Sequence, residues 1–226
     1  MKDRNYKKVN TSKPSKKQIR IMNSQTPLIL IDANEISLPN PPREGSPEEK
    51  AETRLIIKAL KNSSQADMEF ADLADKSMIS IFKSFAIENG LYFDDEYYLD
   101  LTKQLKTIIL NLKFKFNRKR PESVNKKIDS KNYKSTKSPA YPSGHAAQAY
   151  VIANTLSREY PHLEQSILNI ADRIALSRFQ AGAHFPSDLR AGQYLANLLD
   201  DYVLGPESQK ELYMEHNKFR NITREF

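Results

Sequence analysis

Apolar side chains recur at intervals of three or four residues in several separate stretches of this 226-residue chain. This spacing places them along one face of an α-helix, where they can pack against other helices. The stretches cover residues 47–61, 66–89, 94–116, 143–160, 163–179 and 187–204, with a short piece at 207–219. Runs of alternating β-branched residues, which are typical of strands, are nearly absent. The sequence therefore predicts an all-α fold, a single-domain bundle of about six or seven helices.

Two parts of the chain depart from the helical pattern. Residues 1–20 contain eight Lys and Arg against one acidic residue, Asp3, which equals the net charge of +7 of the whole chain. We therefore expect a basic, disordered N-terminal arm over residues 1–25, followed by a helical domain over residues 26–226. Residues 117–142 are rich in Lys, Asn, Ser and Pro, and predict a long basic loop.

Composition excludes several classes of protein. The chain has no Cys, so disulfides, thiolate metal sites and cysteine nucleophiles are all ruled out. No apolar run reaches the roughly 18 residues that span a bilayer, and no export signal is evident at the N-terminus. We expect no transmembrane insertion and a soluble, cytoplasmic protein, or a periplasmic one if a longer chain has been trimmed.

The first of three clusters of polar residues lies at the end of the stretch 94–116. Lys113 and Arg120 are seven residues apart, which is two helical turns, so they project from one face. A run of charge is more often a solvated face than a site, and Lys115, Arg118 and Lys119 fit that interpretation.

The second cluster is Pro142-Ser143-Gly144-His145, at the start of a predicted helix. Ser143 is a good N-cap, whereas Gly144 is a poor choice for a first turn unless something must approach the backbone closely. Free N–H groups and the positive end of the helix dipole favour an anion here. The alternative is an ordinary capped helix with an incidental histidine.

The third cluster combines Arg178, His184 and Asp188 within the stretch 177–188. Arg178 can bind an oxyanion through two N–H groups, His184 can attack or transfer a proton, and Asp188 can orient the imidazole ring. The alternative is a helix cap with a salt bridge to Arg178 or Arg190.

Together the clusters resemble a known signature. In order, the chain reads Lys113-x6-Arg120-Pro121, Pro142-Ser143-Gly144-His145 and Ser177-Arg178-x5-His184-x3-Asp188. This pattern is similar at all eleven positions to that of the type 2 phosphatidic acid phosphatase superfamily, which includes the vanadium-dependent haloperoxidases. The proline-rich stretch 38–45 is similar to the soluble bacterial class A non-specific acid phosphatases, whereas Glu122 departs from their pattern.

The resemblance implies a role for each residue. Lys113, Arg120 and Arg178 would bind the phosphoryl oxygens, together with the backbone of Ser143 and Gly144 and the Ser143 hydroxyl. His184 would be the nucleophile that forms a phosphohistidine, Asp188 would hold its ring, and His145 would act as the acid and base. His162 and His216 match no motif, and we expect both on the surface.

The leading hypothesis is a metal-independent phosphomonoesterase that acts on a small phosphorylated substrate without a cofactor. A haloperoxidase that uses the same pocket is an alternative, with vanadate as its cofactor rather than as an inhibitor. Another alternative is a basic protein that binds nucleic acid or a membrane surface through the N-terminal arm, although that arm has no aromatic residue beyond Tyr6. The leaving group of the substrate and any homo-oligomer stay open.

Overall fold

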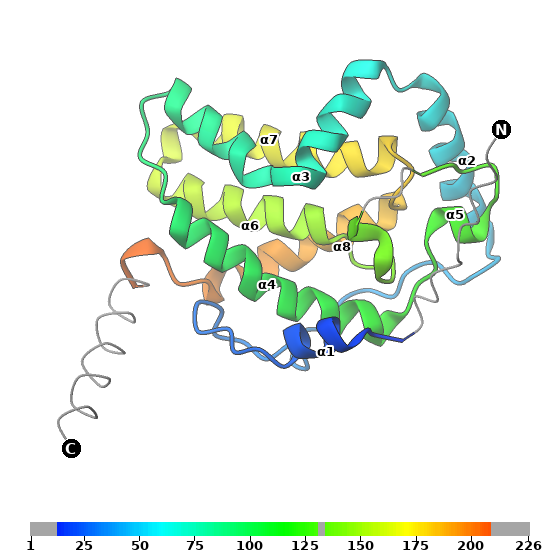
Figure 1. The fold of residues 1–226 in the computed structure, drawn as a ribbon, viewed down its shortest axis with the longest axis horizontal. Helices are drawn as coiled ribbons and strands as arrows, with labels where there is room; N and C mark the ends of the chain where they lie inside the picture. Colours follow the sequence, from blue (N-terminus) through cyan, green and yellow to red (C-terminus); the bar gives the residue numbers. More distant parts are fainter. Residues whose placement is uncertain (1–12, 131–133, 209–226) are drawn as a thin grey trace.

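The computed structural model describes residues 13–130 and 134–208, and within these ranges it forms a helical bundle without a strand (Figure 1). The all-α prediction is confirmed. The α-helices are α1 (Lys16–Met22), α2 (Pro47–Asn62), α3 (Gln65–Glu88), α4 (Asp95–Phe116), α5 (Pro121–Val124), α6 (Gly144–Glu159), α7 (Glu164–Gln180) and α8 (Pro186–Leu199). Three short 3-10 helices accompany them: η1 (Lys134–Lys137), η2 (Pro161–Leu163) and η3 (Asp200–Tyr202).

Helix α6 lies at the centre of the bundle, with α3, α4, α7 and α8 around it (Figure 1). Its buried residues point in every direction around the helix axis, as expected of a helix that is covered on all sides. These residues are Ala146, Ala147, Ala149, Tyr150, Val151, Ile152, Ala153, Thr155, Leu156 and Ser157. Because four of them are alanines, neighbouring helices can approach α6 closely.

One end of the bundle collects the ends of four helices. The C-terminal ends of α4 and α7 and the N-terminal ends of α6 and α8 meet there, at the right in Figure 1. Helix α4 ends because Asn117 adopts the left-handed conformation, with a φ of 48°. Serine and aspartate side chains cap the starts of several helices, including Ser46 before α2 and Ser143 before α6. The three polar clusters of the sequence all lie at this end.

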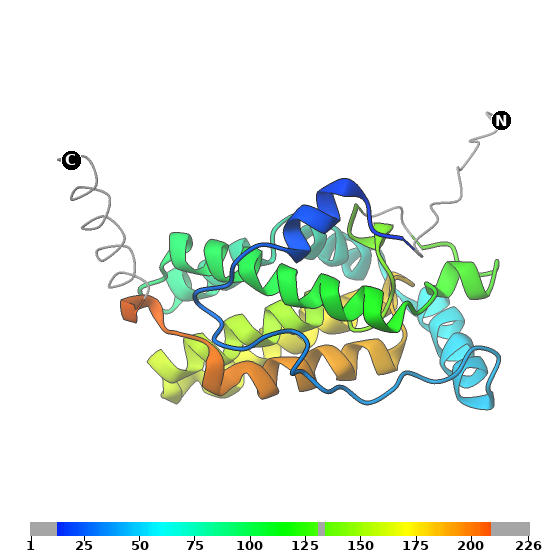
Figure 2. The same ribbon diagram turned by 90° about the horizontal axis from the view of Figure 1, so that it is seen from below.

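We expected a disordered arm over residues 1–25, and this expectation is wrong for the second half of that range. Residues 16–22 form α1, which packs on α4 through hydrogen bonds from Thr107 Oγ1 to the Ile21 carbonyl (2.9 Å) and from Asn111 Nδ2 to the Met22 carbonyl (3.0 Å). The chain then runs along the bundle to α2 (Figure 2). Residues 1–12 lie outside the described part of the chain.

Two further expectations need correction or completion. The predicted loop over 117–142 contains helix α5 and the 3-10 helix η1, so it is more structured than expected. Of the predicted helical piece at 207–219, only the start is described, because residues 209–226 lie outside the described ranges. Within those ranges no helix has the length and apolar character needed to cross a membrane.

Helix α3 bends at Ser77, whose backbone is extended rather than helical (φ −162°, ψ 89°), and the bend is visible in Figure 1. The Ser77 side chain accepts a hydrogen bond from the Ser80 backbone N–H (3.4 Å), so it caps the second half of the helix. The Ser80 hydroxyl donates to the Ser77 carbonyl at 2.8 Å. The bend changes the direction of α3 beside the functional end of the bundle.

The close contact between α6 and α8 depends on Gly192. A Cβ atom there would lie 2.7 Å from the Ser143 carbonyl oxygen and 3.0 Å from the Ala147 backbone nitrogen. We expect Gly192→Ala to lower the free energy of unfolding by about 1–3 kcal/mol, because α8 must move away from the backbone of α6. Urea denaturation measures the change. Gly205→Ala is the control, since nothing lies within 4 Å of its Cβ position; equal stability of the two variants would contradict this account.

Candidate active site

His184 sits at the centre of the functional end and is held by both ring nitrogens. Its Nδ1 lies 3.1 Å from Asp188 Oδ2, and its Nε2 lies 2.9 Å from Arg120 Nη1. A guanidinium can only donate hydrogen bonds, so Nε2 must accept and the ring proton must reside on Nδ1. This arrangement gives Nε2 a lone pair. His184 is 3% exposed, and it lines the cavity described below.

The electrostatic surroundings keep the imidazole neutral. Burial lowers the pKa of His184 well below its ordinary value of 6.5, and the positive charges of Arg120, Lys113, Arg178 and Arg118 lower it further. The pKa of Arg120 falls to about 10, chiefly because of burial, so its guanidinium stays charged at neutral pH. A neutral imidazole beside fixed cations is suited to attack on an anion's central atom.

Asp188 is fully buried and is surrounded by donors. Its Oδ2 accepts from the Phe185 backbone N–H (2.9 Å) as well as from His184, and its Oδ1 accepts from Arg118 Nη1 (2.6 Å). Its own carbonyl accepts from the Ser143 N–H at 2.9 Å, which ties α8 to the start of α6. Asp188 thus fixes the ring of His184 and links two of the three polar clusters.

Arg118 and Glu52 form a buried pair behind Asp188. Arg118 Nη2 donates to Glu52 Oε2 at 3.0 Å, and its guanidinium carbon lies 4.0 Å from the centre of the Phe185 ring. Glu52 also accepts from the Ser187 backbone N–H (2.8 Å) and hydroxyl (2.7 Å). The interpretation of Arg118 as part of a solvated face is therefore wrong, because only 6% of the residue is exposed.

Lys113 approaches the site from the last turn of α4. Its Nζ donates to the carbonyls of Pro139 (2.8 Å) and Ala140 (3.0 Å). Burial lowers its pKa well below 10.5, and the charge of Arg120 adds to the effect. A Cβ atom at Gly144 would lie 3.8 Å from Lys113 Cε, so this glycine packs next to the lysine stem.

His145 and Arg178 meet at Asp75, a carboxylate on α3. Arg178 Nη2 donates to Asp75 Oδ1 at 3.0 Å and Nη1 donates to the Ala71 carbonyl at 3.1 Å. His145 Nε2 lies 3.5 Å from the same Oδ1. Burial lowers the pKa of His145 well below 6.5, and the charge of Arg178 is the next largest cause.

These groups surround a cavity of about 610 Å³ between α3, α4 and α6. Five of the predicted site residues line it: Lys113, Arg120, Gly144, His145 and His184. Ser143, Arg178 and Asp188 are fully buried behind this wall. The Ser143 hydroxyl oxygen accepts from the Ala146 N–H (3.4 Å), as an N-cap does. The structure thus brings all eight predicted residues to one place.

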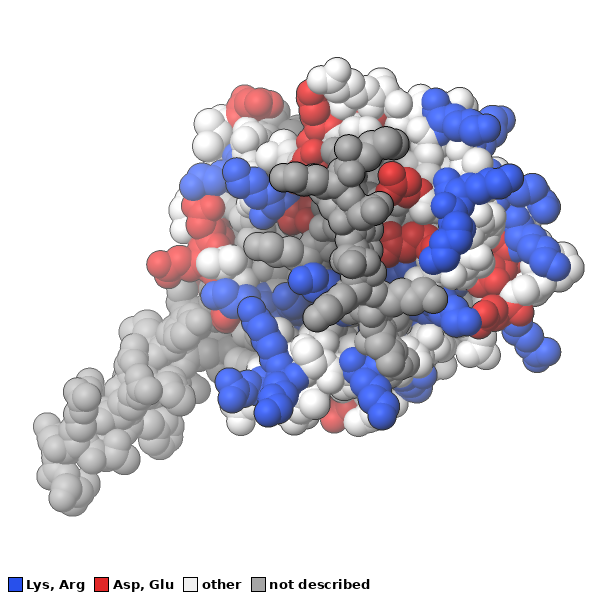
Figure 3. Space-filling view, turned by 45° about the vertical axis from the view of Figure 1, so that its right-hand side comes forward, with Lys and Arg blue, Asp and Glu red and all other residues white. Residues whose placement is uncertain are grey.

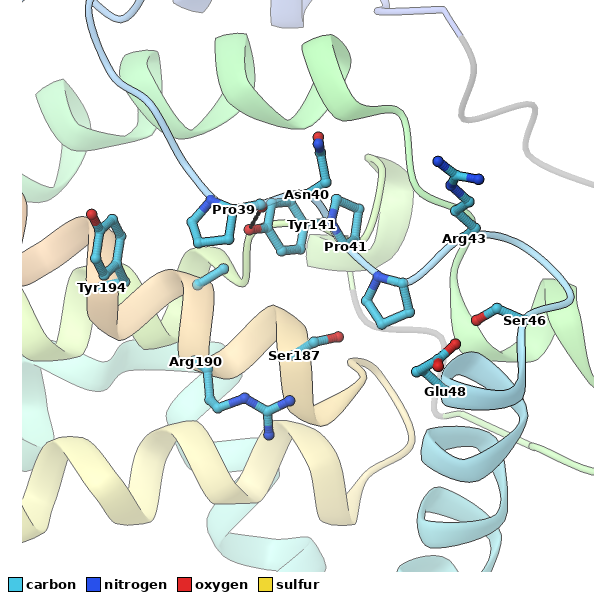
Figure 4. A pocket seen from close by; sticks show the side chains of 12 residues that line it. Pro39, Asn40, Pro41, Arg43, Ser46, Glu48, Tyr141, Ser187, Arg190 and Tyr194 are labelled. Atoms are coloured by element: carbon cyan, nitrogen blue, oxygen red, sulfur yellow. Dashed lines mark hydrogen bonds between the residues drawn. The ribbon is translucent and has the colours of Figure 1, made fainter.

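A second cavity, of about 640 Å³, lies between α8 and the proline-rich segment before α2 (Figure 4). Tyr194, Arg190 and Ser187 face it from α8, and Pro39 and Pro41 face it from the segment. The Tyr141 hydroxyl donates to the Pro39 carbonyl and holds the segment in place. None of the eight predicted site residues lines this cavity.

Two comparisons relate this sequence to known proteins. Residues 101–200 match the family described as the PAP2 superfamily. Over 169 residues the chain is 27% identical to the acid phosphatase of Zymomonas mobilis subsp. mobilis, and the alignment covers 70% of this chain and 64% of that protein. The chain therefore spans less than two thirds of the length of this curated relative.

Over residues 101–200 the chain is therefore similar to the PAP2 superfamily.

The PAP2 match contains all eight predicted site residues but omits two carboxylates that complete the site. Glu52 and Asp75 come from α2 and α3, ahead of the matched part, and sequence reasoning missed both. Neither belongs to a local motif. The sequence did give some indication that Arg118 belongs to the site, since it lies in the same motif as Arg120. Because Lys115 and Lys119 lie close to it, however, it could not be distinguished from an exposed run of charge.

The remaining expectations concern histidines and the loop. His162 is exposed, as expected, and His216 lies outside the described residues. Glu122, which departs from the acid phosphatase pattern, accepts a hydrogen bond from Ser130 through its carboxylate and is not among the residues that line the cavity. On the face seen in Figure 3, Lys and Arg side chains lie among Asp and Glu side chains.

We expect Arg118→Gln to destabilise the folded protein by about 3–5 kcal/mol, because it removes the buried cation that lies between the carboxylates of Glu52 and Asp188 and leaves Glu52 with Arg190 alone, at 3.4 Å. Urea denaturation measures the change. Lys119→Gln is the matched control: its neighbouring ion pair with Glu44 is exposed, and its loss costs about 0–1 kcal/mol. Similar stability of the two variants would show that the buried network contributes nothing.

Stability should also depend on pH through His145 and His184. Their pKa values are lowered on folding, so the unfolded chain binds protons that the folded chain does not. The free energy of unfolding should therefore fall as pH drops below 6.5, by up to about 1.4 kcal/mol per pH unit for each histidine, and this stability is fully present above that pH.

Chemical denaturation between about pH 5 and pH 8 tests this dependence. His145→Gln should flatten the slope, whereas His162→Gln, at an exposed position, should leave it as in the wild type. An equal slope in all three proteins would contradict the assignment of this pH dependence to the buried site.

Proposed function

We propose that this protein hydrolyses phosphomonoesters without a metal cofactor, through a phosphohistidine at His184. The observation that carries the proposal is the position of His184, which lines the cavity and whose Nε2 has a lone pair and lies 2.9 Å from Arg120 Nη1. The likeness to an acid phosphatase and to the PAP2 superfamily supports the same reaction class.

In the first step, Nε2 of His184 attacks phosphorus and the bond to the leaving oxygen breaks. His145, in its protonated form, gives its proton to that oxygen. The phosphorylated ring keeps its proton on Nδ1, which donates to Asp188, so the positive charge that develops on the imidazole is stabilised by a buried carboxylate. Arg120, which donates to Nε2 in the empty site, turns to the phosphoryl oxygens.

In the second step, water attacks the phosphohistidine. His145, now neutral, accepts a proton from the water, the bond between phosphorus and Nε2 breaks, and the electron pair returns to the ring. His145 is again protonated while phosphate is bound, and it gives up this proton to phosphate or solvent as the product leaves. Two histidines are needed because the nucleophile cannot also serve as the acid and base.

Cations stabilise the charge of the transferring group. Lys113 and Arg120 line the cavity, and Arg178 lies behind them with its guanidinium held by Asp75. Positioned positive charge in a buried site is the main catalytic need of phosphoryl transfer. Burial and then the same charges lower the pKa of His145 in the empty site, and a bound phosphate dianion offsets the effect of the charges. Substrate binding thus favours protonation of His145.

Vanadate has the shape and charge of phosphate, and the same cradle of cations would bind it. We propose that it acts here as a competitive inhibitor. Oxidation of a halide by hydrogen peroxide after loading with vanadate would instead favour the haloperoxidase alternative.

The decisive variant is His184→Ala, assayed on p-nitrophenyl phosphate in the presence of EDTA. We expect kcat to fall at least about 1000-fold, because the nucleophile is lost, and we expect EDTA to leave the wild-type rate unchanged. His162→Ala is the matched control, because this exposed histidine contacts no site residue. Full turnover by His184→Ala, or loss of the wild-type rate in EDTA that a divalent metal restores, would reject the mechanism.

A further inference from the structure

The cavity continues well beyond the phosphoryl cradle, along the bent part of α3. Six consecutive residues, 74–79, line it. Successive side chains of a straight helix point about 100° apart, so a straight helix would not present six residues in a row to one space. They line it here because the backbone at Ser77 is extended. The bend thus exposes this segment to whatever is attached to the phosphoryl group.

The opposite wall is a row of side chains along α4. Leu99, Thr102, Lys106 and Lys113 all line the cavity, each roughly one or two helical turns from the next. Lys113 is buried at the cradle, whereas Leu99 is 48% exposed at the far end. Lys106 lies seven residues before Lys113, which corresponds to about 10 Å along the helix axis. The cavity therefore runs lengthwise from the cradle to solvent.

Two lysines at the outer part of this cavity have no acidic partner in the part of the chain that the structure describes. Lys106, on α4, and Lys76, on the bent segment of α3, are both exposed, and within residues 13–130 and 134–208 neither forms an ion pair with a carboxylate. Among the described residues, the one acidic residue that lines the cavity is Asp75, which is engaged with Arg178 and His145. The outer cavity thus carries positive charge that the phosphoryl cradle does not use.

The geometry points to a second anion subsite in the outer cavity, and we propose that it binds a phosphate on the leaving group of the substrate. Two ammonium groups suit a dianion. Apolar Met78 and Leu99 and the polar side chains of Thr102 and Gln148 would contact the body of the molecule between its two phosphates. The inference rests on the proposed function and narrows it to phosphomonoesters whose second phosphate lies about two helical turns from the scissile one.

The probes are hexane-1,6-diol bisphosphate and the matching monophosphate. The ratio of their kcat/KM values, corrected for the two equivalent phosphates, should be about tenfold in the wild type, since a charge-assisted contact is made by the bisphosphate alone. Lys106→Gln should lower this ratio, and adding Lys76→Gln should lower it further, to about one. Raising the salt concentration should reduce the wild-type ratio, because the lysines are exposed.

Lys103→Gln is the matched control, because Lys103 is exposed on the same helix and does not line the cavity. A wild-type ratio near one, or a ratio that falls equally in Lys103→Gln and Lys106→Gln, would overturn the subsite. Calorimetric binding of the bisphosphate to His184→Ala separates this question from catalysis. Weaker binding on adding Lys106→Gln supports the subsite and unchanged binding overturns it, whereas absence of turnover on both probes counts against the proposed function.

Discussion

The rest of the site depends on the ionised carboxylate of Asp188 at the start of α8. It is fully buried, and it accepts hydrogen bonds from His184, Arg118 and the Phe185 backbone. A buried carboxylate without such donors would take up a proton and could no longer orient the imidazole. Arg118 supplies the charge, and Glu52 balances and positions Arg118 from a different helix. The reactive ring is thus held by a chain of buried charges.

The predicted site residues could be found from the sequence because each cluster is local. Lys113 and Arg120 share a helix end, and His184 and Asp188 are four residues apart. Their partners could not be found in this way. Glu52 lies 66 residues from Arg118, and Asp75 lies 103 residues from Arg178, so only the folded bundle brings these pairs together. Without them, a buried arginine looks like one more residue of a basic run.

The helices were predictable for the same reason, whereas docking was not. Ser15 and Gln18 form a capping box at the start of α1, and this signature is present in the sequence. The basic charge of residues 1–20 nevertheless favoured a prediction of disorder. Leu99 fits the apolar face expected for α4, yet it is 48% exposed and lines the cavity. Periodicity predicts which face of a helix is apolar, but it does not tell whether a neighbouring helix covers that face or a ligand does.

The proposed mechanism requires a covalent bond between phosphorus and His184. Mixing the protein with substrate, quenching within one turnover under alkaline conditions that preserve phosphohistidine, and mapping the peptides by mass spectrometry tests it directly. The account predicts one phosphoryl group on the peptide that contains His184, with none in Asp188→Asn at the same time point, because the ring is then no longer held in the attacking tautomer. Turnover without a phosphorylated peptide, or a phosphoryl group on another residue, would contradict it.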